Sequence, residues 1–452
     1  MNQADNTSRP ACRKPAECLK VKNPGMMILA LLVSVFVSVF LWRGLPSFID
    51  SINRMLFGYD ELFIPVWLHG TLQMFFAIYV WGSLFPFVFF SLLANLPDKK
   101  KRFSTRLPFV SVIIPSFNEE SNISRCIESA LAIDYPFYEV IVVDDGSRDL
   151  TAPIIENYNV SVIRLRDNHG KSAALNRGLE RARGEIVFFT DSDSYLDPMV
   201  LKYLVSNFSD PFTGAVAGKV LLRKTDSYLK RMQAIEYLYG QSVIKEAQVR
   251  SGYSVSICPG PVTAFRRDVL LEAGGFKDRT LAEDFDITLD LLERGYETVY
   301  EPRAIAYTSA VNSWSVLKKQ RIRWSRGHLQ VYREHHQTLF TGKTGLLSLF
   351  WLPYALFIGF GSAFLEMMFI VVFPSIVVLS AMPLTFLKFG IAYMLVMECL
   401  TALQGAISLL QSRHNSVSLM LSTFLTQPYR IFLSYTRVVA FSDELKNKRS
   451  TW

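Results

Sequence analysis

The chain has 452 residues, half of them hydrophobic, and only 19% are charged. This composition is apolar for a soluble protein, so part of the chain is expected to lie in a membrane. The formal net charge is +8, but basic residues gather beside apolar stretches, as in 98–106 (DKKKRFSTR). That placement is typical of cytosolic membrane flanks and argues against nucleic-acid binding. The five cysteines are scattered without a CxxC pair, which argues against structural zinc and against a disulfide framework.

Two apolar stretches lie in the N-terminal part of the chain. Residues 1–25 are basic and are expected to form a cytosolic tail, and 26–42 then run without a charge. A second charge-free stretch, 62–95, ends at the basic cluster. The flanking charges favour two transmembrane helices within 26–95, which return the chain to the cytosol. A cleaved signal peptide is the alternative for the first stretch, but the apolar run is not followed by a small-residue cleavage site.

Short apolar runs separated by turn residues characterise 96–344. Near-continuous apolar runs of this length predict a parallel sheet covered by helices on both faces, an α/β fold. Ligands in such sheets bind at the carboxyl ends of the strands. Polar and acidic residues follow three of the runs, so that edge is expected to form an acidic site. The four expected strands are Val110–Ile114, Val140–Val143, Val160–Ile163 and Ile186–Phe189.

The region 345–452 is apolar again and ends in a basic tail. The stretches 346–382 and 384–411 are each long enough to cross a membrane. The last segment, 417–441, contains proline and arginine, so crossing, re-entrant and interfacial placements all stay open for it. Two or three transmembrane or interfacial helices are therefore expected here, with a cytosolic C-terminus favoured by the basic tail.

Asp191 and Asp193 are candidate metal ligands directly after the fourth expected strand. Alternate residues of an extended segment point the same way, so the two carboxylates can share one side of the strand end. Carboxylates suit Mg²⁺ or Mn²⁺, which would offset the charge of a diphosphate leaving from a nucleotide-sugar. The same DxD pattern also fits a turn before a helix, so the pattern alone leaves both interpretations open.

Four motifs in order strengthen the enzymatic interpretation. The segments Ser111–Glu119 (SVIIPSFNE) and Val142–Ser147 (VVDDGS) resemble the opening of the family 2 glycosyltransferases. The DxD, an acidic motif at 282–284 (AED) and Gln320–Trp324 (QRIRW) then follow in that family's order. The resemblance covers 110–333, and the flanking apolar stretches are similar to its membrane polysaccharide synthases, which make cellulose, chitin oligomers, hyaluronan or poly-N-acetylglucosamine.

The resemblance implies a GT-A nucleotide-sugar fold over 96–344, placed on the cytosolic side of the inner membrane. It also implies an inverting, metal-dependent transfer from a UDP-sugar to a growing glycan, with the lipid bilayer as a further partner. A small accessory membrane subunit is a partner that the resemblance allows. Nucleic acid is not expected to bind.

The resemblance assigns the nucleotide side of the site to four residues, and Lys171 is added from its own position in the sequence. Phe117 would stack on the uracil, and Asp145 would accept a hydrogen bond from the ring N–H, with Asp144 and Glu119 as supporting neighbours. A strand-ending turn is the structural alternative for the two aspartates. Lys171 precedes a helix-like run, so its charge and the helix N-terminus could both face a phosphate. A solvated surface lysine is the alternative.

The acidic motif is expected to supply the general base. Asp284 occupies the family's base position, and Glu283 beside it is assigned to the acceptor side. One carboxylate suffices for an inverting transfer, because it takes the acceptor's proton while the metal-bound diphosphate leaves from the opposite face. Asp286 is a nearby rival for the role. The family's threonine is replaced here by Ala282, and both acids could also act only as favourable charges near a helix start.

The QxxRW motif is typical of the processive members of the family. Gln320 and Arg323 are assigned to the nucleotide-sugar, since a guanidinium offers several donors to phosphate or sugar oxygens. Trp324 offers a flat surface on which an acceptor sugar can stack. The same segment also fits a basic amphipathic helix against lipid headgroups, and both interpretations can hold together.

A processive synthase is the leading functional hypothesis. The size and the two-helix leader resemble the branch that makes poly-β-1,6-N-acetylglucosamine, an exopolysaccharide of biofilms. Cellulose-, chitin- or hyaluronan-type synthesis and transfer of a single sugar to a lipid carrier are the enzymatic alternatives. A transporter or receptor with a degenerate nucleotide-binding domain is the non-enzymatic alternative, and the intact motif set argues against it.

Overall fold

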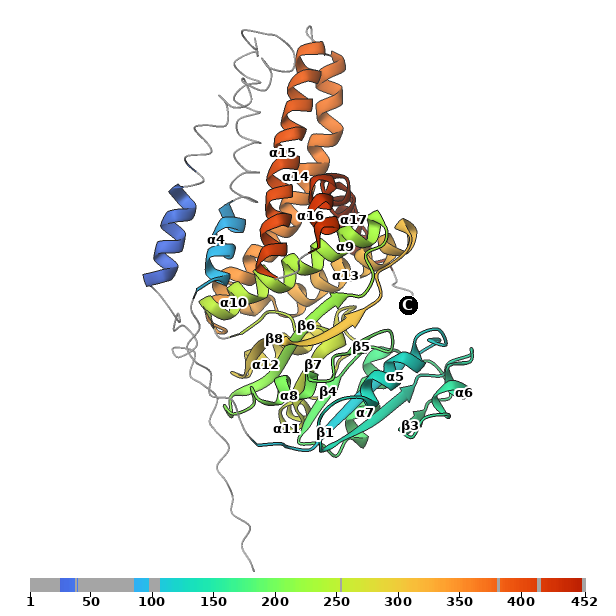
Figure 1. Cartoon of the computed structure of the whole chain (residues 1–452). Coiled ribbons are helices and arrows are strands. Elements are labelled where there is room, and N and C mark those ends of the chain that lie inside the picture. Colours follow the sequence, from blue (N-terminus) through green and yellow to red (C-terminus); the bar gives the residue numbers. More distant parts are fainter. Residues whose placement is uncertain are drawn as a thin grey trace, which may run out of the picture.

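The computed structural model describes residues 25–36, 39, 85–96, 106–252, 254–379, 383–412 and 416–448. An α/β domain forms one end of the molecule, and a pair of long helices forms the other (Figure 1). The expected N-terminal tail, the loop between the first two apolar stretches and most of the second stretch lie outside the described residues.

The α/β domain contains an eight-stranded sheet in the order β3-β2-β1-β4-β7-β6-β8-β5. All four strands expected from the sequence are present. The strands are β1 (Val110–Ser116), β2 (Tyr138–Asp144), β3 (Ser161–Arg164), β4 (Ile186–Phe189), β5 (Tyr195–Leu196), β6 (Thr213–Leu222), β7 (Thr263–Arg266) and β8 (Glu297–Thr308).

The four expected strands form a parallel group, as predicted, but the complete sheet is mixed. The pairs β1·β2, β2·β3, β1·β4 and β6·β8 are parallel, but β7 is antiparallel to both β4 and β6, and β5 is antiparallel to β8. Parallel strands are joined by crossovers that return the chain to the starting edge. The long helical segment after β6 does not bring the chain back to the edge where β6 began. Strand β7 therefore starts at the edge where β6 ends and runs antiparallel to it.

Helices cover both faces of the sheet, as the sequence predicts. Neighbouring residues of β1 point to opposite faces, so Val112 belongs to one hydrophobic cluster and Ile113 to the other. The first cluster includes side chains of α5 and α8, and the second includes side chains of α7, α11 and α12. The covering helices are α5 (Ile123–Leu131), α6 (Thr151–Ile155), α7 (Lys171–Arg181), α8 (Val200–Val205), α11 (Arg267–Glu272) and α12 (Glu283–Glu293).

Helices α9, α10 and α13 form a layer between the sheet and the long helices (Figure 1). A π-helical segment, Gly240–Lys245, joins α9 to α10. A second π-helical segment, Leu347–Trp351, leads into the long helices. The remaining elements are α4 (Phe85–Ala94), α9 (Tyr228–Tyr239), α10 (Glu246–Ser251), α13 (Trp314–Glu334), α14 (Leu352–Leu379), α15 (Pro383–Gln411), α16 (Val417–Ser422) and α17 (Gln427–Leu445).

Within the described residues, Leu347–Val372 is the one helical stretch long and apolar enough to cross a membrane. Gly25–Phe36 is a shorter apolar helix. Large apolar side chains of α14 stand uncovered, including Phe357 at 59% and Val371 at 66% exposure, as expected for contact with lipid. Helix α17 packs against α13 and α14, and the crossing, re-entrant and interfacial placements of the last segment all stay open. Crossing by the other apolar stretches stays a prediction.

Candidate active site

The carboxyl ends of β1, β2 and β4 meet at one edge of the sheet. Ser116 at the end of β1 pairs in register with Asp144 at the end of β2. Strand β4 lies on the other side of β1 and ends at Phe189, two residues before Asp191. The polar segments that follow these strands therefore come together, as the sequence predicts.

The two aspartates at the carboxyl end of β2, Asp144 and Asp145, are buried and hold the neighbouring backbone in place. The carboxylate of Asp145 accepts hydrogen bonds from the backbone N–H of His169 at 2.9 Å and of Gly170 at 2.8 Å. Asp144 accepts from the backbone N–H of Ser147 at 3.1 Å. Each carboxylate oxygen has a second lone pair, so Asp145 can still accept a hydrogen bond from a ligand. The side chain of Phe117 is 41% exposed and can offer its ring to a base.

Asn118 joins the loop after β1 to the loop after β2, a contact that sequence analysis missed. Its backbone N–H donates to Ser147 Oγ at 2.9 Å, and its side-chain oxygen accepts from Arg148 N–H at 2.9 Å. Its φ of 54° lies in the left-handed region, which asparagine tolerates better than most residues. These bonds fix the backbone directly after Phe117. An asparagine directly after an aromatic residue at a strand end is the signal that could have indicated the turn.

Glu119 lies close enough to the DxD for their charges to interact. Burial raises the pKa of Glu119, and the negative charge of Asp191 raises it further. Asn122 opposes this shift by donating a side-chain hydrogen bond to the carboxylate at 2.9 Å. Glu119 is therefore part of the acidic centre as well as a neighbour of the nucleotide loop.

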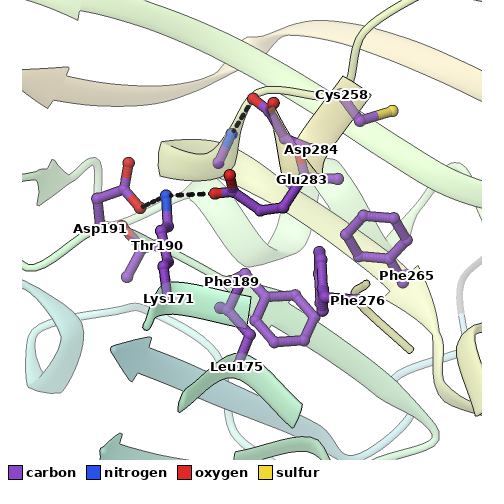
Figure 2. Close-up of a pocket in the computed structure, with 12 residues that line it drawn as sticks. Lys171, Leu175, Phe189, Thr190, Asp191, Cys258, Phe265, Phe276, Glu283 and Asp284 are labelled. Atoms are coloured by element: carbon purple, nitrogen blue, oxygen red, sulfur yellow. Dashed lines mark hydrogen bonds and ion pairs between the residues drawn. The ribbon is translucent and has the colours of Figure 1, made fainter. Parts of the chain in front are cut away.

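Lys171 joins two of the predicted motifs. It is the first residue of α7, and its ammonium lies 2.7 Å from Asp191 Oδ1 and 2.9 Å from Glu283 Oε1 (Figure 2). Burial disfavours the charged lysine, but the two carboxylates outweigh it and raise the Lys171 pKa. The same contact lowers the pKa of Glu283 against the effect of burial. The structure thus places this lysine between carboxylates, where the sequence predicted a phosphate contact.

Asp193 completes the acidic centre at the end of β4. Burial and the nearby charges of Asp191 and Glu119 raise its pKa to about 6. Among the described residues, its oxygens receive only long hydrogen bonds, from Ser194 Oγ at 3.2 Å and Thr308 Oγ1 at 3.4 Å. These carboxylate oxygens repel one another and receive only weak hydrogen bonds. A divalent cation stabilises such a group of oxygen ligands. The arrangement fits the metal role predicted for the DxD.

A second group with metal-ligand geometry lies elsewhere in the described part of the chain. Ligand atoms of Asp290, Glu293 and His335 lie within 4.8 Å of one another. Asp290 already forms ion pairs with two basic side chains, because Lys277 Nζ lies 2.6 Å and Arg279 Nη2 lies 3.2 Å from its carboxylate oxygens. We interpret this group as a charge network that holds α12 against the end of α13.

Asp284 lies in the first turn of α12 and lines the same pocket as Lys171 and Asp191 (Figure 2). Its carboxylate accepts from the backbone N–H of Phe285 at 2.8 Å and of Gly260 at 3.3 Å. Burial and the neighbouring Glu283 raise the pKa of Asp284 to about 6. A carboxylate with a pKa in this range can take up a proton near neutral pH.

The structure gives a steric reason for glycine at position 260, which the sequence alone did not show. A Cβ at this position would lie 3.1 Å from Lys171 Nζ and 3.3 Å from Asp191 Oδ2. Any larger residue would press on the ion pair between those two side chains. The Gly260-Pro261 turn therefore shapes the pocket by its small size.

Asp286 is fixed in a charge network, which makes it a weaker candidate than Asp284 for the base. It is buried, and it accepts from Arg279 Nε at 2.9 Å and pairs with His335 Nε2 at 2.8 Å. Although burial opposes ionisation, these two partners lower the pKa of Asp286. A carboxylate committed to two cationic side chains is a poor proton acceptor.

The QxxRW motif lies on α13, as the helical interpretation predicts. The positive charge of Arg323 contributes to the lowered pKa of Glu283, so this helix approaches the same pocket. Trp324 is half-buried, and Gln320 accepts a hydrogen bond from Arg321 at 2.7 Å. The motif is thus brought to the acidic edge from a different layer of the fold.

Comparison with known proteins gives the family. The model of "Glycosyl transferase family 2" matches residues 111–274. A poly-β-1,6-N-acetyl-D-glucosamine synthase of Staphylococcus aureus (strain COL) is 30% identical over 287 residues, covering 62% of this chain and 68% of that protein. The protein of the same name from Staphylococcus epidermidis is 28% identical over 362 residues, covering 76% and 86%. The chain belongs to glycosyltransferase family 2.

A solved structure confirms the GT-A fold of this glycosyltransferase. The mannosyltransferase PcManGT from Pyrobaculum calidifontis, in complex with GDP-Man and Mn²⁺, superimposes with a TM-score of 0.62 at 20% identity. The match covers 83% of this chain and 98% of the other. At this identity the likeness establishes the fold, and the roles of individual residues rest on the geometry described above.

Proposed function

We propose that this glycosyltransferase is a processive, inverting, metal-dependent synthase that uses a UDP-sugar. The carrying observation is that Lys171, Asp191, Glu283 and Asp284 line one pocket at the carboxyl edge of the sheet. The names of the Staphylococcus relatives favour UDP-N-acetylglucosamine as donor and poly-β-1,6-N-acetylglucosamine as product. The enzyme is also proposed to translocate that polymer across the membrane.

The nucleotide is proposed to bind beside the loop that Asn118 fixes. Phe117 stacks on the uracil, and Asp145 accepts from its ring N–H through the lone pairs that the loop backbone leaves. Asp144 and Glu119 support the surrounding turns. An aromatic face combined with a ring-edge acceptor gives both affinity and orientation for a planar base.

Asp191 and Asp193 would hold the Mg²⁺ or Mn²⁺. When bound, the cation supplies positive charge against the negative charge that develops on the leaving diphosphate. Lys171 adds a second positive charge at the same edge and keeps the Asp191 carboxylate oriented. Arg323 and Gln320 are proposed to contact the donor from the side of α13.

Asp284 is the proposed general base. It removes the proton from the acceptor hydroxyl as that oxygen attacks the anomeric carbon, and UDP leaves from the opposite face. This single displacement inverts the anomeric configuration. Glu283 is assigned to the acceptor, and its ion pair with Lys171 keeps its carboxylate next to the base.

The organisation proposed for the chain places 96–344 in the cytosol as the catalytic domain. The regions 26–95 and 345–452 would anchor it in the inner membrane, with residues 1–25 as a cytosolic tail. Helix α13 lies between the sheet and the long helices, so an acceptor stacked on Trp324 would be near the membrane side (Figure 1). That placement suits a chain that leaves toward the bilayer.

Sizing the product tests the proposal. We expect full-length protein in detergent to convert radiolabelled UDP-N-acetylglucosamine into long polymer, and to use UDP-glucose and UDP-glucuronate poorly. The polymer is measured by gel filtration and by its sensitivity to a β-1,6-specific glucosaminidase. Product of one added sugar on a lipid would instead show the single-transfer alternative, and long polymer from another donor would correct the proposed sugar.

Activity is expected to fall as the pH is lowered through about 6. The pKa of Asp284 is raised to about 6, so this carboxylate is ionised above that pH and protonated below it. Only the ionised form can accept the acceptor's proton, so kcat/KM should fall about tenfold per pH unit on the acid side. Rates of UDP release measured between pH 4.5 and 8 at saturating metal check this. A flat profile down to pH 5 would contradict Asp284 as the base.

A further inference from the structure

Arg321 is a buried residue inside the QxxRW motif that the proposed function does not use. Its side chain is 4% exposed, although arginine is seldom fully buried without partners. The guanidinium carbon lies 4.2 Å from the centroid of the Trp324 ring. Positions three apart on a helix share one face, so α13 itself brings the two side chains together.

Partners from two other helices fix the guanidinium. Its Nη2 lies 2.8 Å from Glu236 Oε2 on α9, and its Nη1 donates to Gln320 Oε1 at 2.7 Å. The hydroxyl of Tyr429 on α17 donates to the same Glu236 oxygen. Both terminal nitrogens of Arg321 are thereby directed by bonds that do not involve the indole. Its buried Nε has no hydrogen-bond partner among the described residues.

The guanidinium of Arg321 lies over the ring of Trp324. A guanidinium stacks on an aromatic ring through its flat face while its edges stay free for hydrogen bonds, a combination that the ammonium of lysine cannot provide. A separation of 4.2 Å is well inside the range of cation–π attraction. The contact restricts rotation of the indole, and it occupies one of the two ring faces.

We infer that Arg321 is a positioning residue for the acceptor: it holds the Trp324 indole at a fixed angle, so that the acceptor sugar stacks on the opposite ring face. The inference rests on the proposed acceptor role of Trp324. Glu236 and Tyr429 act through Arg321, so helices α9 and α17 set the angle of the acceptor platform together with α13. Holding the platform lowers the entropy cost of binding each newly extended chain end.

Arg326 provides a matched control on the same helix. It is also buried, and it also pairs with α17, since its Nε lies 3.1 Å from Glu444 Oε2. The two arginines differ in their relation to Trp324, because Arg321 is the one that lies over its ring. Replacing either arginine by lysine keeps the positive charge and removes the flat guanidinium.

The experiment compares Arg321→Lys, Arg326→Lys, Trp324→Ala and the double variant Arg321→Lys/Trp324→Ala in full-length protein, with radiolabelled UDP-N-acetylglucosamine. We expect Arg321→Lys to shorten the mean product about three- to tenfold, the range for losing a partly desolvated cation–π contact. Donor KM and UDP affinity should stay at wild-type values. Arg326→Lys should give product of wild-type length.

The double variant decides whether Arg321 acts through the indole. If it does, Arg321→Lys has no further effect once Trp324 is alanine, because coupled residues are non-additive. Equal further shortening in that background overturns the inference, as does wild-type length from Arg321→Lys or a parallel loss of UDP binding. Full-length polymer from Trp324→Ala would instead remove the acceptor role itself, so the two failures are distinguishable.

Discussion

Asp284→Asn is expected to lower the rate of sugar transfer by about 10²–10⁴-fold, the usual cost of removing a general base. The amide keeps the shape of the carboxylate, but its single oxygen can accept from only one of the two backbone N–H groups that the Asp284 oxygens bind, those of Phe285 and Gly260. It cannot take up the acceptor's proton at neutral pH. UDP binding should therefore stay close to the wild-type value, measured by calorimetry on the same preparation used for the rate of UDP release.

Asp286→Asn is the matched control for this prediction. Asp286 lies two residues further along α12, but it pairs with Arg279 and His335 instead of lining the pocket. Its loss leaves two cationic partners without their buried carboxylate, so we expect a lower melting temperature with little change in rate per folded molecule. An Asp284→Asn protein that kept half of its activity would show that another group is the base.

Local patterns in the sequence predicted the elements that carry the site. Three of the apolar runs became β1, β2 and β4 because buried strands read as continuous apolar segments. The fourth run became β3, an edge strand whose residues alternate between partly buried and exposed. Polar residues at their ends met at one edge because parallel strands share a carboxyl edge, which follows from topology alone. The helical stretch after the acidic motif is α12, whose first turn holds Glu283 and Asp284.

Contacts between distant segments could not be predicted in the same way. The ion pairs of Lys171 join the start of α7 to motifs further along the chain, and single-chain periodicity carries no information about such pairing. The antiparallel placement of β7 depends on where the helical segment after β6 ends. Arg321 looked like one of several basic residues of an amphipathic helix, and only its packing against Glu236 and Trp324 sets it apart.

Removal of divalent metal is expected to abolish turnover. Asp191, Asp193 and Glu119 already repel one another, since the charges of Asp191 and Glu119 contribute to the raised pKa of Asp193. A diphosphate would add further negative charge at the same edge, and Lys171 alone cannot balance the whole group. A bound cation supplies several kcal/mol of charge stabilisation in such sites, so we expect a loss of about 10³-fold or more after dialysis against EDTA.

Adding Mn²⁺ or Mg²⁺ back should restore the rate. Two variants then identify the metal ligands. Asp193→Asn should raise the metal concentration needed for half-maximal rate and lower the rate at saturation, because it removes one of the two proposed ligands. Glu293→Gln alters the other cluster of potential ligands, Asp290, Glu293 and His335, where protein cations already balance the carboxylates. Its metal dependence should match the wild type. A carboxylate that binds the metal must alter the metal titration when it is removed. If Glu293→Gln shifted the metal dependence and Asp193→Asn did not, the functional cation would therefore belong to the cluster of Asp290, Glu293 and His335.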